Sequence, residues 1–192
     1  DGATGRDRGD GGAGRGLGMI FLRHPKPEVQ EGICYGQTDL DIGSEGEAQI
    51  ALALKATPRI ARVIASPARR CRALAEALAA RDDVALSFDP RLRELDFGAW
   101  EGVPWDEIPR WASDPWADDP WTVAPPGGET FAKLHTRVAA AIREIGPGNS
   151  ALVCHAGPIR AARMILTGAS FDEVFAEPVP YGPAFVAMWE PV

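Results

Sequence analysis

The chain has 192 residues, 45% of them hydrophobic and 24% charged, which is typical of one globular domain and argues against a disordered or fibrous protein. Its 20 Lys and Arg residues against 27 Asp and Glu residues give a net charge of -7, which disfavours nucleic acid and anionic lipid as partners. We therefore expect a small-molecule substrate, no nucleic-acid partner and no membrane partner, and an anionic substrate would require arginines gathered in one pocket.

The N-terminal residues 1–18 are nearly all glycine and charged residues. So little apolar surface cannot offset the entropy of ordering the chain, which predicts a flexible, glycine-rich tail. The first methionine, Met19, opens an apolar run. We expect one folded domain over residues 19–192.

Strands and helices alternate along this domain. In chain order, the apolar patterns predict a strand over 19–22, a helix from 44 to about 57, a strand over 62–65 and, after Pro67, a helix to about 81. They then predict a strand over 84–88, a helix over 131–145, a strand over 151–154, a helix after Pro158 to about 166 and a strand over 183–189. This alternation favours an α/β fold, a three-layer sandwich with a mostly parallel central sheet and helices on both faces. Such sheets bind ligands beyond the carboxyl ends of their strands.

Two of the predicted helices have marked boundaries in the sequence. Ser44 and Glu47 have the spacing of a capping box, which predicts a helix start at residue 44. Apolar residues recur at spacings of 3, 4, 4 and 3 along the helix over 131–145, at Phe131, Leu134, Val138, Ile142 and Ile145. The run Gly146-Pro147-Gly148 then stops this amphipathic helix.

The cysteines Cys34, Cys71 and Cys154 are odd in number and widely spaced, which favours a reducing compartment. No apolar stretch approaches the roughly 20 residues that span a bilayer, and residues 1–18 lack the apolar core of a signal peptide. We therefore expect a cytoplasmic protein. Cys71 lies on an apolar helix stripe and Cys154 ends a predicted buried strand, so packing explains both thiols.

Two of the three histidines follow the last residue of a predicted strand. His24 comes directly after Arg23, whose charged fork fits phosphate, so this pair indicates an anion beside an imidazole. His155 precedes Ala156-Gly157-Pro158 and a helix start, where free N–H groups favour a bound anion. The third, His135, lies on the amphipathic helix and is interpreted as structural. Two imidazoles and an arginine predict phosphoryl chemistry, and three scattered histidines do not form the close ligand set of a metal enzyme.

Five motifs occur along the chain in one order. They are Leu22-Arg23-His24, Ser66-Pro67-Ala68-Arg69-Arg70-Cys71, the run from Leu92 to Gly102, Gly127-Gly128-Glu129-Thr130 and Val153-Cys154-His155-Ala156-Gly157. This order resembles the histidine phosphatase superfamily, which has the phosphoglycerate mutase-like fold, over nearly all of Met19 to Val192. The run from Cys34 to Leu40 and the Ser-Pro-x-x-Arg-Cys form look most like the alpha-ribazole phosphatase branch, which acts late in cobalamin assembly.

The resemblance implies a metal-independent phosphomonoester hydrolase, without a cofactor, that works through a phosphohistidine on His24. Arg23, Arg70 and His155 would hold the phosphoryl oxygens and provide the charge stabilisation that other phosphotransfer enzymes obtain from magnesium. Glu94 would be the general acid that protonates the leaving oxygen and then the base that activates water.

Further substrate contacts are expected from Gly157, Gln37 and Thr38. Arg69 competes with Arg70 for the phosphate role. Counting from the serine of the second motif, the arginine of the family falls on Arg70, so we expect Arg69 to face solvent.

One residue departs from the pattern of the family. Most relatives have glycine after the nucleophilic histidine, whereas here Pro25 fixes φ and has no N–H. Any phosphate contact from that backbone donor is absent, and substrate contacts from residues 26–33 are left unassigned.

Five of the six tryptophans fall within 22 residues, at Trp100, Trp105, Trp111, Trp116 and Trp121. Large side chains at this density predict a small lid over about 98–126 that packs on itself. The alternative is that some of these rings line a leaving-group pocket, where an aromatic group would stack.

The leading substrate from the resemblance is alpha-ribazole 5'-phosphate, and a homodimer is compatible with the sequence. One alternative is a phosphoglycerate-type mutase, which must return phosphate to product, but the chain is short for a mutase and lacks a long enclosing insertion. A second alternative is a non-catalytic phosphate-binding module on the same fold. The joint presence of the candidate catalytic residues disfavours it, because a pure binder needs no general acid; these residues are His24, Arg23, Arg70, Glu94 and His155.

Overall fold

The computed structural model describes residues 18–187, so the predicted tail over 1–18 lies outside the described residues except for its last position, as do positions 188 and 189 of the last predicted strand. The strands are β1 (Met19–Arg23), β2 (Arg62–Ala65), β3 (Leu86–Phe88), β4 (Ser150–Cys154) and β5 (Gly182–Ala187). The α-helices are α1 (Gly46–Ala56), α2 (Arg69–Asp82), α3 (Arg110–Asp118), α4 (Phe131–Ile145), α5 (Ala156–Thr167) and α6 (Phe171–Ala176). Three short 3-10 helices are η1 (Pro90–Leu92), η2 (Gly98–Trp100) and η3 (Trp105–Glu107).

The five strands form one sheet in the order β3-β2-β4-β1-β5. All neighbouring pairs are parallel except β1 and β5, so the predicted mostly parallel sheet is confirmed. Arg23 of β1 lies opposite Cys154 of β4, and Val153 of β4 lies opposite Ala65 of β2. The three central strands therefore end together at one edge of the sheet.

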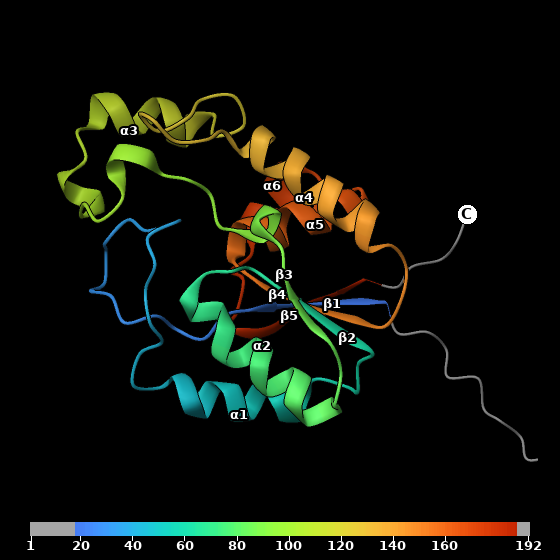
Figure 1. Cartoon of the computed structure of the whole chain (residues 1–192). Coiled ribbons are helices and arrows are strands. Elements are labelled where there is room, and N and C mark those ends of the chain that lie inside the picture. Colours follow the sequence, from blue (N-terminus) through green and yellow to red (C-terminus); the bar gives the residue numbers. More distant parts are fainter. Residues whose placement is uncertain (1–17, 188–192) are drawn as a thin grey trace, which may run out of the picture.

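Helices cover both faces of the sheet, with α1 and α2 on one face and α4, α5 and α6 on the other (Figure 1). Side chains alternate along β1 to match. Ile20 and Leu22 belong to the apolar core that α2 completes, and Met19 and Phe21 belong to the core that α4 and α5 complete. Two buried apolar layers thus fix the strand ends in place. Within residues 18–187, no helix combines the length and the apolar character that crossing a bilayer requires.

Strand β2 and helix α4 have the bounds that the sequence predicts, whereas β3 is shorter than the predicted strand over 84–88. The reason is the end of α2. Asp83 takes a left-handed conformation with φ of 53°, and the N–H of Val84 donates to the carbonyl of Ala79 at 3.1 Å. Val84 therefore closes the helix rather than opening the strand.

The predicted capping box at Ser44 is wrong. Helix α1 begins at Gly46, and Glu45 before it has helical backbone angles and makes no side-chain cap. The N–H of Gly46 donates to the carbonyl of Gly43 at 2.9 Å. A turn therefore leads the chain into the helix, and Ser44 does not occupy the cap position.

Helices α3 and α6 have no counterpart among the predicted elements. Helix α3 contains Pro115, a residue that normally argues against a helix because it lacks an N–H. Helix α6 has only six residues, but Ser170 and Glu173 form a full capping box at its start.

Candidate active site

The carboxyl ends of three neighbouring strands carry polar side chains. Strand β4 lies between β1 and β2, and the three strands are followed by His155, His24 and Ser66, respectively. Backbone bonds continue past the strand ends, because the N–H of His24 donates to Cys154 at 3.0 Å and that of Ser66 donates to Val153 at 2.9 Å. The rings of His24 and His155 meet edge to face, with centroids 5.0 Å apart.

Two hydrogen bonds fix the tautomer of His24. Its Nδ1 lies 2.7 Å from the carbonyl oxygen of Pro25, which can only accept, so Nδ1 carries the proton. Its Nε2 lies 3.3 Å from Nε of Arg70, which can only donate, so Nε2 is unprotonated. Pro25 lacks an N–H, yet its carbonyl orients the imidazole, and a glycine at this position would offer the same carbonyl.

Burial is the main reason that the pKa of His24 falls from 6.5 to about 3. The charge of Arg70 lowers this pKa further, the bond to the Pro25 carbonyl opposes the shift, and Arg23 adds a smaller lowering. The ring is therefore neutral at the pH of an ordinary assay. The neutral form is the one that has a nucleophilic lone pair.

The imidazole nitrogens of His24 are expected to show no titration between about pH 5 and 8. Because the pKa of His24 is about 3, the ring stays neutral and keeps the Nδ1–H tautomer over this pH range. Nitrogen-15 NMR of histidine-labelled protein measures the state of each nitrogen directly. Protonation of Nε2 with a midpoint near the ordinary value of about 6.5 would contradict the assignment.

Arg70 is fully buried and stabilises the loop over residues 36–38 beside His24. Its Nη1 donates to the carbonyl of Thr38 at 2.8 Å and its Nη2 to that of Gly36 at 2.5 Å, in addition to the Nε bond. A guanidinium has five N–H groups, so two of them stay available to an anion. Arg69 has a side chain that is 54% exposed and pairs with a surface carboxylate, as expected.

Arg23 lines the cavity beside His24. Its Nη1 donates to the carbonyl of Val179 at 2.6 Å, and its guanidinium carbon lies 4.3 Å from the centroid of the Tyr181 ring. Its Nε is buried and has no hydrogen-bond partner in the described part of the chain. A buried donor left unpaired costs on the order of 1–3 kcal/mol, which a ligand oxygen accepting from it would recover.

His155 is completely buried, and only one of its ring nitrogens is satisfied. Its Nε2 lies 2.8 Å from Oγ of Ser66 and 3.6 Å from Sγ of Cys71, whereas Nδ1 has no partner among residues 18–187. Burial, followed by the neighbouring His24 and the charge of Arg70, holds the pKa of His155 well below its usual range. If the Ser66 hydroxyl donates to Nε2, a proton on Nδ1 is available to a phosphoryl oxygen.

The cysteines Cys34, Cys71 and Cys154 are all buried, free thiols. Burial is the main cause that raises the pKa of Cys34 and Cys71 to about 12, and it raises the pKa of Cys154 well above its usual value. Thiols that stay protonated are poor nucleophiles. Cys71 and Cys154 belong to the two core clusters, in agreement with their interpretation as packing residues.

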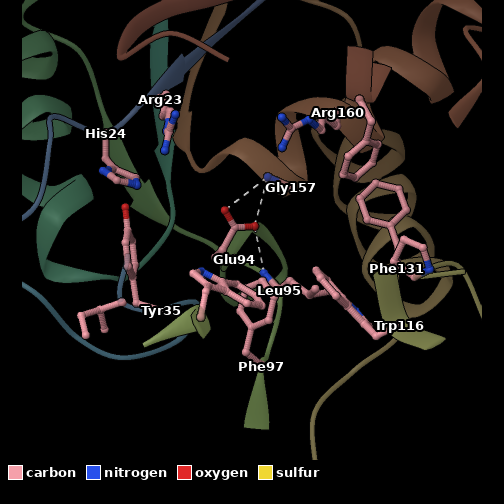
Figure 2. Close-up of a pocket in the computed structure, with 14 residues that line it drawn as sticks. Arg23, His24, Tyr35, Glu94, Leu95, Phe97, Trp116, Phe131, Gly157 and Arg160 are labelled. Atoms are coloured by element: carbon pink, nitrogen blue, oxygen red, sulfur yellow. Dashed lines mark hydrogen bonds between the residues drawn. The ribbon is translucent and has the colours of Figure 1, made fainter. Parts of the chain in front are cut away.

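Glu94 lies in the same cavity, and backbone N–H groups hold its carboxyl group (Figure 2). The N–H of Leu95 lies 2.9 Å from Oε1, and the N–H of Gly157 lies 3.0 Å from Oε1 and 3.3 Å from Oε2. Gly157 thus contacts Glu94, and its contact with substrate remains a prediction. A group in this place can exchange a proton with an oxygen on a phosphorus held at His24.

Arg137, from α4, fixes the backbone around Glu94. Its Nη1 donates to the carbonyls of Arg91 and Arg93 at 2.7 and 2.6 Å, and its Nη2 donates to that of Glu94 at 2.9 Å. An ion pair with Glu129 holds the guanidinium and connects the Gly-Gly-Glu-Thr motif to this loop. The sequence does not indicate Arg137, because it lies inside a helix and 43 residues from Glu94.

Gly157→Ala is expected to lower kcat/KM for phosphates with poor leaving groups by about 10- to 100-fold. A Cβ on Gly157 would lie 2.2 Å from Oε1 of Glu94, so the carboxyl group would have to move. Gly43→Ala is the matched control, because its Cβ would have no neighbour closer than 3.4 Å. Steady-state kinetics on both folded variants make the comparison. Unchanged kinetics in Gly157→Ala would show that the placement of Glu94 does not limit the reaction.

The sequence predicts that Gln37 and Thr38 bind substrate. Both residues lie in a loop that hydrogen bonds hold to the side chain of Glu101. The N–H groups of Gly36, Gln37 and Thr38 donate to the Glu101 carboxylate at 2.8 to 3.0 Å, and the Thr38 hydroxyl donates to it as well. The side-chain amide of Gln37 donates to the carbonyl of Glu94 at 3.3 Å. Neither residue is part of the described cavity lining. They position the loop, and their contact with substrate remains a prediction.

The cavity has a volume of about 390 Å³, with Arg23, His24 and Glu94 at its polar end (Figure 2). Most of the remaining wall is apolar and consists of Ile33, Leu95, Phe97, Trp105, Trp116, Pro120, Phe131 and Phe175. Tyr35, Gly157 and Arg160 complete the lining. Arg160 is the one charged lining residue that sequence reasoning missed, because it lies within a helix and outside all five motifs.

The tryptophan-rich segment both packs on itself and lines the cavity. Trp105 and Trp116 stack with centroids 5.6 Å apart and an interplanar angle of 22°, and both contribute to the cavity wall. Phe97 meets both rings edge-on, and Trp100 packs behind them in a small buried cluster. Trp111 is 82% exposed. The aromatic wall therefore comes from a subset of the tryptophans.

Phosphoryl transfer is the class of reaction to which this cavity is suited, because a neutral imidazole with a free nitrogen shares it with an arginine and a carboxyl group. The sequence matches the family model of the histidine phosphatase superfamily (branch 1) over residues 19–186. The chain belongs to this superfamily and is a phosphomonoesterase.

Similar sequences and solved structures support the same assignment. The glucosyl-3-phosphoglycerate phosphatase of Mycolicibacterium vanbaalenii is 31% identical over 182 residues, which cover 80% of this chain and 76% of that protein. The native structure of a mycobacterial glucosyl-3-phosphoglycerate phosphatase matches with a TM-score of 0.75 at 25% identity, covering 88% of each chain. The structure of that enzyme with VO3 matches with a TM-score of 0.72, also at 25% identity and 88% coverage of each chain. These relatives do not support the finer resemblance to the alpha-ribazole branch.

Proposed function

We propose that this phosphatase hydrolyses small phosphate monoesters through a covalent phosphohistidine on Nε2 of His24. Nε2 attacks phosphorus in line with the leaving oxygen, while Arg23, Arg70 and His155 hold the other phosphoryl oxygens. Glu94 gives its proton to the leaving oxygen as the P–O bond breaks. The resulting carboxylate then takes a proton from the water that attacks phosphorus, and the N–P electron pair returns to Nε2 as phosphate leaves.

The observation that carries this proposal is the tautomer of His24. Pro25 and Arg70 together leave Nε2 unprotonated in the same cavity as Glu94. The bond from Arg70 to Nε2 is long, at 3.3 Å, and its N–H would turn to a phosphoryl oxygen when substrate binds. Nε2 of His24 is then free to attack phosphorus while Arg70 neutralises negative charge on the phosphoryl group.

Two substrates are the leading candidates. Alpha-ribazole 5'-phosphate comes from the motif resemblance, and the aromatic cavity wall suits its ring system. Glucosyl-3-phosphoglycerate comes from the names of the relatives. The deciding experiment ranks both, with 3-phosphoglycerate, sugar phosphates and phosphothreonine, by kcat/KM. A preference for one of the two of at least 10-fold over the rest of the panel would support it as the substrate, and equal values across the panel would contradict both.

The same assay separates hydrolysis from the alternatives. A phosphoglycerate-type mutase would transfer phosphate between positions of 3-phosphoglycerate and release little of it, and a binding module would release none. In the described part of the chain, no three His, Cys, Asp or Glu side chains converge where they would share a metal ion. We expect full activity in EDTA, and a loss that added metal restores would contradict the metal-independent mechanism.

We further propose that the tryptophan-rich segment forms the wall against which the leaving group packs. Trp116→Ala is expected to raise KM for aryl phosphates by about 10-fold, because it removes one stacked ring of the wall. Trp111→Ala is the control, since its ring is 82% exposed and is not part of the cavity lining. Inhibition by inorganic phosphate should change little in either variant. An unchanged KM in folded Trp116→Ala would remove the stacking role.

A further inference from the structure

Arg160 is a cationic lining residue for which the proposed reaction has no use. It belongs to α5, three residues beyond Gly157, and Figure 2 shows it reaching into the cavity on the side opposite to His24. In this view Glu94 lies between His24 and Arg160. Because Glu94 must meet the leaving oxygen, the space beyond it, where Arg160 lies, is the space of the leaving group.

The direct contacts of the Arg160 guanidinium are with neutral groups, a backbone carbonyl and an aromatic ring. Its Nε donates to the carbonyl of Val174 at 3.2 Å, and its carbon lies 4.5 Å from the centroid of the Phe175 ring. Among residues 18–187, no carboxylate lies within 4.0 Å of it. Burial is the main cause that lowers the pKa of Arg160. A half-buried charge without a counter-ion is a site that favours an anionic ligand.

The hydrogen-bonding capacity of Arg160 points to the same conclusion. A guanidinium has five N–H donors, and the bond to Val174 uses one of them. The remaining donors form a planar fork that matches two oxygens of a planar anion. Phe175 packs against one face of the guanidinium.

The charge balance favours a carboxylate over a second phosphate. One guanidinium neutralises one negative charge, so a dianionic phosphate at this end would leave excess charge against an apolar wall.

We propose that Arg160 binds a carboxylate on the leaving group, so that the preferred substrates are phosphate monoesters whose alcohol carries a carboxylate. This assignment rests on the proposed function, because it places the leaving group in the cavity beyond Glu94. It makes Arg160 a substrate-binding residue that sets specificity, distinct from Arg23 and Arg70 at the phosphoryl end.

The experiment compares isosteric substrates that differ in one charge. Phenyl phosphates with a carboxylate at the 3 or 4 position are paired with the matching carboxamides, and the ratio of kcat/KM is measured for each pair. The 3-substituted pair and the 4-substituted pair each give one ratio. In the wild type, we expect the larger of these two ratios to favour the carboxylate over the carboxamide by about 10- to 100-fold. In Arg160→Gln the ratio should fall by about 10- to 100-fold relative to the wild type, with the carboxamide rate changed less than about 3-fold. Comparing ratios between variants cancels differences in leaving-group reactivity.

Two further variants separate the charge and the fork of Arg160 from a general effect of changing α5. Arg163→Gln is the matched control on the same helix, because Arg163 pairs with Glu177 outside the cavity, and it should keep the wild-type ratio. Arg160→Lys keeps the charge but loses the fork, so its ratio should lie between those of the wild type and Arg160→Gln. This variant also tests the proposal if Arg160→Gln does not fold.

Several results would overturn the inference. An unchanged ratio in Arg160→Gln would leave Arg160 with a structural role only, connecting α5 to α6. Equal losses of kcat/KM on the carboxylate and the carboxamide would instead place Arg160 at the phosphoryl group. Hydrolysis of p-nitrophenyl phosphate, measured in parallel, separates the role of Arg160 from the proposed function. If that activity proceeds through His24 while the wild-type ratio is near 1, only the role of Arg160 fails. If no phosphate ester is hydrolysed, the proposed function fails and the inference fails with it.

Discussion

Replacing His24 with alanine is expected to lower kcat/KM for p-nitrophenyl phosphate by on the order of 10⁴-fold or more. The substitution removes the only imidazole nitrogen of the cavity that two fixed partners, Pro25 and Arg70, keep unprotonated. No described thiol can take its place, because burial keeps all three protonated. Steady-state kinetics with p-nitrophenyl phosphate measure the loss.

His135→Ala is the matched control for this substitution. His135 lies on α4, packs against Trp121 with centroids 5.4 Å apart and does not line the cavity. Its removal should leave kcat/KM within about 3-fold of the wild type. Full activity in His24→Ala would rule out His24 as the nucleophile.

Replacing Glu94 with glutamine should lower kcat/KM by on the order of 10² to 10⁴ for alkyl phosphates and by much less for p-nitrophenyl phosphate. Glutamine keeps the shape of the side chain and an oxygen that accepts the N–H bonds of Leu95 and Gly157, but it has no acidic proton to give. An alkoxide is a poor leaving group and needs that proton, whereas nitrophenolate leaves without it.

The dependence on the leaving group is the readout that separates an acid from a structural residue. Glu144→Gln is the control, because Glu144 is 73% exposed and pairs with Arg91 away from the cavity. It should behave as the wild type on both substrates. Equal losses on alkyl and nitrophenyl phosphates in Glu94→Gln would remove Glu94 from the acid role.

The sequence predicts the fold best where burial dictates a regular pattern. The helix over Phe131–Ile145 and the strand over Arg62–Ala65 have their predicted bounds because one face of the helix and most of the strand are buried. The prediction of helices fails where local contacts, rather than a repeating apolar pattern, determine whether a helix forms and where it begins. Helix α3 includes a proline, α6 has six residues, and α1 starts from a turn rather than from a serine cap.

The site likewise contains residues that the sequence identifies and residues that only the folded structure reveals. His24 and His155 are recognisable from sequence because each follows a strand, and parallel strands of one sheet end together. The tautomer of His24 depends on Arg70, from α2, and no spacing in the sequence encodes that contact. Arg137 and Arg160 lie inside helices, and their roles come from which loop or cavity the packed helix faces.

The most direct test of the phosphohistidine mechanism is a rapid-quench experiment with p-nitrophenyl phosphate, followed by mass spectrometry of the quenched protein. Nitrophenolate leaves readily, so the phosphoenzyme should form faster than it breaks down. We expect a burst of nitrophenol equal to the enzyme concentration and an acid-labile phosphate on His24. Turnover at the full steady-state rate without a burst and without phosphate on His24, or with the phosphate on another residue, would contradict this mechanism.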